Sequence, residues 1–280
     1  MCAFIRAAQR KYRIDSAFVP RHNESIAIRW RLFSSESRPA PAFCCFGLFG
    51  IMPMFRTILF DFDGTLIFSL DCWFRAFVSA LDRYGIRMEE SEIISRCFYR
   101  PYADVAKDLD LPSGQELKEF VHEGLTLTYP DAELFPGVTA LLNDLRATGA
   151  RMAIVTSSPR EHVTATLETL GIREHFDVIV AVEDTTTHKP DPAPVLLALE
   201  RLGSGPDGAI FIGDYIVDVQ AGKAAGVVTG LHLPSGHTRF YDFDVLRKTE
   251  PDFAFSTFSE LSDYLLPGVR EAQSGSRAVR

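Results

Sequence analysis

The stretch TILFDFDGTL, residues 57–66, decides how this chain of 280 residues folds. It begins with a short run dominated by apolar residues, as expected for a strand that helices cover on both faces of a parallel sheet. An acid follows, and Gly64 then marks a tight turn. We expect a buried strand over 57–61 that delivers Asp61 and Asp63 to the carboxyl edge of a sheet.

Four later segments repeat this pattern of an apolar run that ends in small or polar residues. They predict strands over 151–158, 176–184, 208–214 and 226–233. Helical patterns alternate with these strands at 137–148, 159–170, 192–202 and 217–225. Alternation at this spacing predicts the α/β class, with a doubly wound, Rossmann-like parallel sheet as its core.

About ninety residues between the first and second predicted strands carry no strong strand signal. Helical patterns occur there over 71–84, 89–97, 101–109 and 114–128. We therefore expect a helical cap at 71–134, inserted into an α/β core made of 54–70 and 135–266. The polar segment 267–280 is predicted to be a disordered tail.

The N-terminal segment differs in composition from the rest of the chain. Residues 1–55 hold eight basic and three acidic residues, a net charge of +5, so the total of −8 leaves −13 for the remainder. The apolar run at 42–55 is shorter than the ~20 residues that span a bilayer, so we expect no membrane contact. We interpret 1–53 as a disordered extension or, because it is rich in Arg and poor in acids, as a targeting-like leader.

The charge and the cysteine content indicate which kinds of partner and which cellular compartment to expect. An acidic body opposes nucleic-acid binding, which requires Lys and Arg to displace counterions, and it favours binding of a cation. The five cysteines fit neither a zinc site nor an even disulfide framework, which indicates free thiols in a reducing compartment. We therefore predict a cytoplasmic protein, or an organellar one if the leader is a transit peptide, that exists as a monomer or small homo-oligomer.

Polar residues of four loops converge on one edge of the predicted sheet, because the carboxyl ends of parallel strands lie together. These residues are Asp61, Asp63, Thr156, Ser157, Lys189, Asp214 and Asp218. Carboxylates packed this closely repel one another unless a cation neutralises them. Mg²⁺ prefers oxygen ligands and leaves positions open for a substrate phosphate. A metal, a lysine and a hydroxyl around one point would hold a phosphoryl group.

The two acids of the first loop suit two different chemical tasks. Asp61 as a nucleophile would form an aspartyl-phosphate. Asp63 would then protonate the leaving oxygen and later deprotonate water. Thr65, which we also place among the substrate-binding residues, is expected to orient Asp63 by a hydrogen bond. Asp61 and Asp214 are the natural direct ligands of Mg²⁺, and Asp218 would support them.

Four segments carry these polar residues: DFDGTL (61–66), VTSS (155–158), HKPDP (188–192) and GDYIVD (213–218). In this order and at this spacing they resemble the four motifs of the haloacid dehalogenase superfamily. The resemblance extends from residue 57 to about 266, the helical cap included. It is strongest to the branch of phosphoglycolate phosphatases, pyrophosphatases and β-phosphoglucomutases.

Two positions depart from that pattern. Phe68-Ser69 stands where members of the superfamily often have Asp-Ser, and Tyr215 stands where many have serine. Neither position replaces a group that the proposed chemistry needs. Both departures are expected to reshape the substrate pocket or the cap hinge.

The resemblance implies a metal site and a two-acid mechanism. Asp61 would be the nucleophile and a Mg²⁺ ligand. Asp63 would be the acid/base and would also offer its backbone carbonyl to the metal. Asp214 would bind Mg²⁺ directly or through water, and Asp218 would do so through water.

The resemblance also implies how the phosphoryl group is held. Thr156 would bind it with Ser157 nearby, and Lys189 would balance its charge. Within the cap, Arg100 is our candidate for contacting a second anionic group of the substrate. Trp73 is predicted to belong to the cap core.

Together these features predict a Mg²⁺-dependent phosphatase that hydrolyses a small phosphate monoester through a phospho-aspartate. A phosphoglycolate-like metabolite is the leading substrate, under a mobile cap that excludes bulk water. A sugar-phosphate mutase or a pyrophosphatase on the same core is the alternative. A catalytically silent binding module is a further one, and the intact acids and Lys189 count against it.

Overall fold

The strands of the protein form one parallel sheet in a computed structural model that describes residues 54–267. They are β1 (Thr57–Phe60), β2 (Arg151–Val155), β3 (Val178–Val180), β4 (Ala209–Gly213), β5 (Val228–His232) and β6 (Phe253–Phe255). Their order is β3-β2-β1-β4-β5-β6, and each neighbouring pair is parallel. The predicted doubly wound α/β fold is confirmed, whereas the predictions for 1–53 and 268–280 lie outside the described residues.

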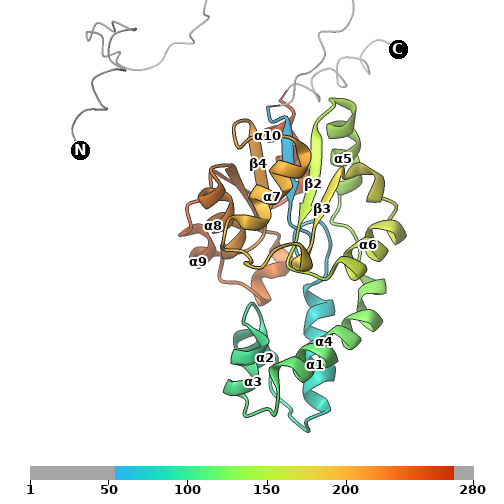
Figure 1. The fold of residues 1–280 in the computed structure, drawn as a ribbon, viewed down its shortest axis with the longest axis vertical. Helices are drawn as coiled ribbons and strands as arrows, with labels where there is room; N and C mark the ends of the chain where they lie inside the picture. Colours follow the sequence, from blue (N-terminus) through green and yellow to red (C-terminus); the bar gives the residue numbers. More distant parts are fainter. Residues whose placement is uncertain (1–53, 268–280) are drawn as a thin grey trace, which may run out of the picture. The chain divides into compact units, whose positions relative to one another are not determined.

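Helices fill the connections between the strands (Figure 1). Four of them lie between β1 and β2: α1 (Leu70–Asp82), α2 (Glu90–Cys97), α3 (Tyr102–Asp108) and α4 (Gly114–Thr128). The others are α5 (Val138–Ala147), α6 (Arg160–Thr169), α7 (Ala193–Leu202), α8 (Ile216–Ala225), α9 (Phe243–Arg247) and α10 (Phe258–Leu265). The helical patterns read between the first two predicted strands therefore correspond to real helices.

Helices cover both faces of the sheet with their apolar sides, as the continuous apolar character of its strands requires. Successive side chains of a strand point to opposite faces. Along β1, Ile58 and Phe60 pack into a cluster with residues of α5, α6 and α10, whereas Leu59 packs into another with residues of α7 and α8. Burial on both sides holds β1 at the centre of the sheet, and its carboxyl end is therefore a fixed platform for the residues that follow.

Two linkers that pair with each other, residues 61–69 and 132–137, join α1–α4 to the rest of the fold. The backbone N–H of Phe68 donates to the Glu133 carbonyl at 2.8 Å, and that of Phe135 donates to the Leu66 carbonyl at 3.0 Å. The ring of Phe68 lies 3.7 Å from that of Phe135, measured between centroids. The first departure from the superfamily pattern thus lies where the inserted helices meet the core.

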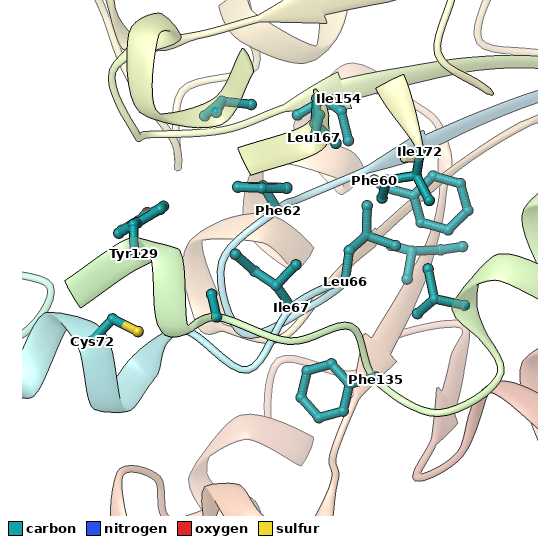
Figure 2. Close-up of a cluster of buried hydrophobic side chains, with 14 of the residues drawn as sticks. Phe60, Phe62, Leu66, Ile67, Cys72, Tyr129, Phe135, Ile154, Leu167 and Ile172 are labelled. Carbon is teal, nitrogen blue, oxygen red and sulfur yellow. The ribbon is translucent and has the colours of Figure 1, made fainter. Parts of the chain in front are cut away.

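One apolar cluster extends from the sheet to the base of the inserted helices. Figure 2 shows Ile154 of β2, Phe62 and Ile67 of the first linker, and Tyr129 after α4 within this cluster. Phe62 is fully buried and stands between the two acids of the first loop. Its burial anchors that loop, so the acids on either side have little freedom to move.

Three elements near the C-terminal end of the described chain were not predicted, namely β6, α9 and α10. β6 has three residues, of which Phe255 alone is buried. Its three apolar residues form a run that is shorter than the four to eight residues by which a strand is recognised in a sequence. Pairing with β5 at the sheet edge, and not local sequence, makes it a strand.

The state of the cysteines and the length and polarity of the helices are also part of the fold. Cys72 and Cys97 are buried and free, while Cys2, Cys44 and Cys45 lie outside the described residues. Within 54–267, no helix is both long enough and apolar enough to cross a membrane.

Candidate active site

Asp61 and Lys189 form the centre of a polar site at the carboxyl edge of the sheet. The backbone N–H of Asp61 donates to the Ile212 carbonyl of β4 at 2.8 Å, which continues the strand pairing up to the acid. Lys189 Nζ donates to Asp61 Oδ1 at 2.7 Å and to Asp218 Oδ1 at 2.6 Å. It also donates to the Val155 carbonyl at 3.3 Å. One buried lysine therefore links the ends of β1 and β2 to the first turn of α8.

Asp214 follows β4 and lies beside Gly64. The Tyr241 hydroxyl donates to Asp214 Oδ2 at 2.6 Å, and the Thr65 hydroxyl donates to Asp214 Oδ1 at 3.2 Å. Gly64 has a φ of +71°, and a Cβ placed on it would lie 2.2 Å from Asp214 Oδ2. Glycine is needed here both for the left-handed backbone and for the space that the carboxylate occupies.

The prediction that Thr65 orients Asp63 is wrong. The turn at Gly64 brings the Thr65 hydroxyl to Asp214, and the side chain is fully buried. Thr65 is also absent from the residues that line the cavity at this edge of the sheet. Its hydroxyl therefore positions a candidate metal ligand.

Three acids lie close enough to hold one metal ion. Single carboxylate oxygens of Asp61, Asp214 and Asp218 lie within 4.8 Å of one another, and all three residues are buried. Lys189 brings one positive charge against three negative ones. Excess negative charge away from water is costly unless a cation joins it, and carboxylate oxygens are ligands that Mg²⁺ prefers. The residues present fit a divalent cation.

Burial and crowding control the protonation of these groups. Burial raises the pKa of Asp61 to about 7; the charge of Lys189 opposes this rise and the charge of Asp218 adds to it. Burial, together with the charges of Asp61 and Asp218, raises the pKa of Asp214 well above its usual range. Burial alone would lower the pKa of Lys189, but the two carboxylates it contacts raise it, so this lysine stays charged. A bound cation would displace protons from the acids.

Asp63 is held by three donors from separate parts of the chain. The Tyr129 hydroxyl donates to Asp63 Oδ1 at 2.5 Å, and Trp73 Nε1 donates to the same oxygen at 3.2 Å. The Ser158 hydroxyl donates to Asp63 Oδ2 at 2.5 Å. Trp73, predicted as cap core, packs against that core only in part. It lies in the first turn of α1, next to the linker, so its indole N–H reaches the acid.

The loop after β2 presents two hydroxyl side chains with different surroundings. Thr156 is buried, and its Oγ1 accepts the backbone N–H of Ser158 at 3.0 Å. Ser157 is exposed. Both residues line the cavity, so each is placed to face a bound molecule.

A cavity of about 530 Å³ joins the carboxyl edge of the sheet to the inserted helices. Seven of the residues predicted for the site line it: Asp61, Asp63, Thr156, Ser157, Lys189, Asp214 and Asp218. Arg100 lines it too, but its Nη1 donates to Asp108 Oδ2 at 3.1 Å and to the Arg96 carbonyl at 2.9 Å. The structure therefore brings the predicted core residues together and gives Arg100 a partner within the inserted helices.

Tyr215, the second departure from the superfamily pattern, contacts the connection between α2 and α3. Its ring stacks on that of Tyr99 with centroids 3.8 Å apart and planes inclined by 20°. The Tyr99 hydroxyl hydrogen-bonds with the Tyr241 hydroxyl, which holds Asp214. Tyr215 thus shapes the cavity wall, while its backbone N–H donates to Asp218 Oδ2 at 3.0 Å.

Sequence reasoning missed several residues that touch the acids. Ser158 stands within the VTSS segment, so the motif itself contained the signal. Tyr129 and Tyr241 are far along the chain from the acids they contact, and no local pattern marks them. Trp73 is ten residues from Asp63 and was predicted to belong to the cap core, not to contact an acid.

A doubly wound sheet with a buried acid, a charge-balancing lysine and a cation-binding carboxylate group at its carboxyl edge defines a class of α/β enzymes that act on phosphoryl groups. A family model described as haloacid dehalogenase-like hydrolase matches residues 58–231. The chain belongs to this family and is a phosphatase.

Similar proteins include curated relatives and solved structures. The chain is 32% identical over 210 residues to pyrophosphatase PpaX of Bacillus pumilus, covering 74% of this chain and 94% of the relative. It is 38% identical over 149 residues to phosphoglycolate phosphatase of Salmonella typhi, covering 52% and 55% respectively. The crystal structure of a predicted phosphoglycolate phosphatase from Haemophilus somnus matches with a TM-score of 0.62, 27% identity and coverage of 76% and 97%. CbbY from Rhodobacter sphaeroides, solved in complex with phosphate, matches with a TM-score of 0.63, 25% identity and coverage of 74% and 96%.

Proposed function

We propose that the protein hydrolyses a small phosphate monoester through a phospho-aspartate at Asp61, in a reaction that depends on Mg²⁺. The observation that carries this proposal is that Asp61 lines the cavity together with the other groups that the reaction needs. It contacts Lys189, lies within 4.8 Å of the other two buried acids, and stands two residues from Asp63. These are the groups that phosphoryl transfer to a carboxylate requires.

In the first step, a carboxylate oxygen of Asp61 attacks phosphorus and the bond to the ester oxygen breaks. Asp63 gives its proton to that oxygen, so the leaving group departs as a neutral alcohol. Three hydrogen bonds from Tyr129, Trp73 and Ser158 fix the Asp63 carboxyl group for this transfer.

In the second step, Asp63 takes a proton from water, and the water oxygen attacks phosphorus. The bond between phosphorus and Asp61 breaks, which releases inorganic phosphate and restores both acids. Lys189 holds Asp61 in place and favours its charged form, and Thr156 and Ser157 bind the phosphoryl oxygens. A divalent cation held by Asp61, Asp214 and Asp218, with the Asp63 backbone carbonyl as a further ligand, would offset the charge on the phosphoryl group.

The substrate we favour is a small, acidic phosphate ester of the phosphoglycolate kind. Relatives named phosphoglycolate phosphatase support this choice. Pyrophosphate is a second candidate, supported by the relatives named pyrophosphatase PpaX, which align over nearly their full length. A sugar-phosphate mutase stays the alternative activity. A cytoplasmic location and a monomeric or small homo-oligomeric state stay predictions.

The proposal is tested by phosphate release from p-nitrophenyl phosphate. We expect release by the wild type, loss of at least about 1,000-fold in Asp61→Asn, and loss with EDTA that Mg²⁺ restores. Asp207→Asn is the matched control, because Asp207 is exposed and away from the cavity. Activity that survives both EDTA and Asp61→Asn would contradict the mechanism, and transfer to a sugar in place of water would favour the mutase.

A further inference from the structure

Three of the polar side chains that the inserted helices and their connections bring to the cavity are already paired. Trp73 donates to Asp63, and Tyr99 hydrogen-bonds with Tyr241. Arg100 is ion-paired with an acid at the end of α3. All three therefore have a partner within the protein, and Asp108 balances the charge of Arg100.

Three polar side chains of the same wall have no hydrogen-bond or ion-pair partner in the part of the chain that the structure describes. They are Tyr102, Lys118 and His122, and all three line the cavity. Lys118 and His122 are four residues apart on α4, so they share one face of the helix. The rings of Tyr102 and His122 meet edge to face, with centroids 6.0 Å apart.

Lys118 supplies the charge of this cluster. Burial, with help from the charges of Lys118 and His162, lowers the pKa of His122 to about 4, so its imidazole is neutral near pH 7. Burial raises the pKa of Tyr102, so its phenol keeps its proton. One cation beside two neutral hydrogen-bonding groups is suited to a carboxylate or a phosphate.

We propose that Lys118, with Tyr102 and His122 beside it, binds a second anionic group on the substrate's leaving group. The substrate class is then a phosphate ester or anhydride whose leaving group carries a carboxylate or a second phosphate. This inference rests on the proposed function, because it concerns the same cavity. It moves the role expected of Arg100 to Lys118, whose ammonium group is uncommitted.

The test compares substrates with and without the second anionic group. Phosphoglycolate and pyrophosphate carry it, as carboxylate and phosphate respectively, whereas p-nitrophenyl phosphate does not. The quantity compared is the ratio of two kcat/KM values, that for the better of the two anionic substrates divided by that for p-nitrophenyl phosphate. In Lys118→Gln, we expect this ratio to fall about tenfold because KM for the anionic substrate rises. Lys118→Arg keeps the charge and should restore most of the ratio.

Two further variants separate binding from folding. Lys107→Gln changes an exposed lysine of α3 that does not line the cavity, and it should leave the ratio within twofold of the wild type. Tyr102→Phe removes only a hydroxyl and should lower the ratio about threefold. Thermal unfolding of each variant monitors the fold.

The outcomes distinguish this inference from the proposed function. No hydrolysis of any of the three substrates by the wild type would overturn the proposed function. Hydrolysis of p-nitrophenyl phosphate alone, or an unchanged ratio in Lys118→Gln, would overturn the Lys118 assignment and leave the phosphatase standing. Preference of the wild type for phosphoglycolate or for pyrophosphate identifies the anionic group that the cluster binds.

Discussion

The carboxyl edge of the sheet and the inserted helices face one cavity but are built differently. At the edge, charged side chains contact one another: Lys189 bridges Asp61 and Asp218. On the inserted helices and the loop between α2 and α3, several aromatic rings line the wall, and Lys118 stands without an ionic partner among residues 54–267. We interpret the edge as the place of the reaction, and we propose that the helices select the leaving group. Each of the following predictions tests this division.

The largest effect is expected from removing the acid/base at the edge. Asp63→Asn cannot exchange a proton, so kcat should fall by a factor on the order of 10² to 10⁴. KM should change little, because the amide can keep some of the contacts with neighbouring donors. Steady-state kinetics alongside Asp207→Asn measures this, and a kcat within tenfold of the wild type would remove Asp63 from the mechanism.

Metal binding should stabilise the edge. Mg²⁺ at about 100 times its Kd should raise the free energy of unfolding by about 2.7 kcal/mol, because the folded state alone assembles the three acids. The measurement is a denaturant titration with EDTA or with Mg²⁺. Asp214→Asn should lose this increment and Asp207→Asn should keep it. An equal increment in Asp214→Asn would place the cation elsewhere.

Tyr129 joins the two regions, because it follows α4 and holds Asp63. Tyr129→Phe removes one of the hydrogen bonds that fix Asp63, for which we expect kcat to fall about tenfold with KM nearly constant. The matched control is Tyr84→Phe, which removes a hydroxyl that contacts Glu116 away from the cavity. If KM rose and kcat held, Tyr129 would belong to substrate binding and the division would need redrawing.

The smallest effect is expected from Tyr215→Ser, which introduces the serine that is common at this position in the superfamily. It removes the ring stacked on Tyr99 but keeps the backbone N–H bonded to Asp218. An aromatic pair contributes about 0.5–1.5 kcal/mol, so KM should rise between about twofold and tenfold with kcat little changed. A fall in kcat larger than the rise in KM would mean that this ring positions the acids.

The same division explains what the sequence could predict. Asp61, Asp214 and Lys189 follow strands that are recognisable as apolar runs, and parallel topology then brings their carboxyl ends together. The two-residue spacing from Asp61 also identified Asp63. Local pattern was sufficient because each residue is placed by the element that precedes it.

Prediction was weaker where position depends on how distant segments pack. Thr65 was predicted to contact Asp63 but contacts Asp214. The direction of the turn at Gly64 depends on the close approach of Asp214, which no local pattern shows. Tyr129 and Lys118 stand on helices whose orientation relative to the sheet follows from packing across the linkers. No short motif encodes that packing, so the pairing of Arg100 with Asp108 could not be predicted, and we propose Lys118 in its place.

The central claim is that Asp61 carries the phosphoryl group during turnover. The most direct measurement is peptide mass mapping after acid quench of Asp63→Asn mixed with p-nitrophenyl phosphate, whose good leaving group needs little help from an acid. The account predicts a phosphoryl group on Asp61, absent when Asp61→Asn is added to the same variant. A phosphoryl group on another residue, or wild-type turnover by Asp61→Asn, would contradict it.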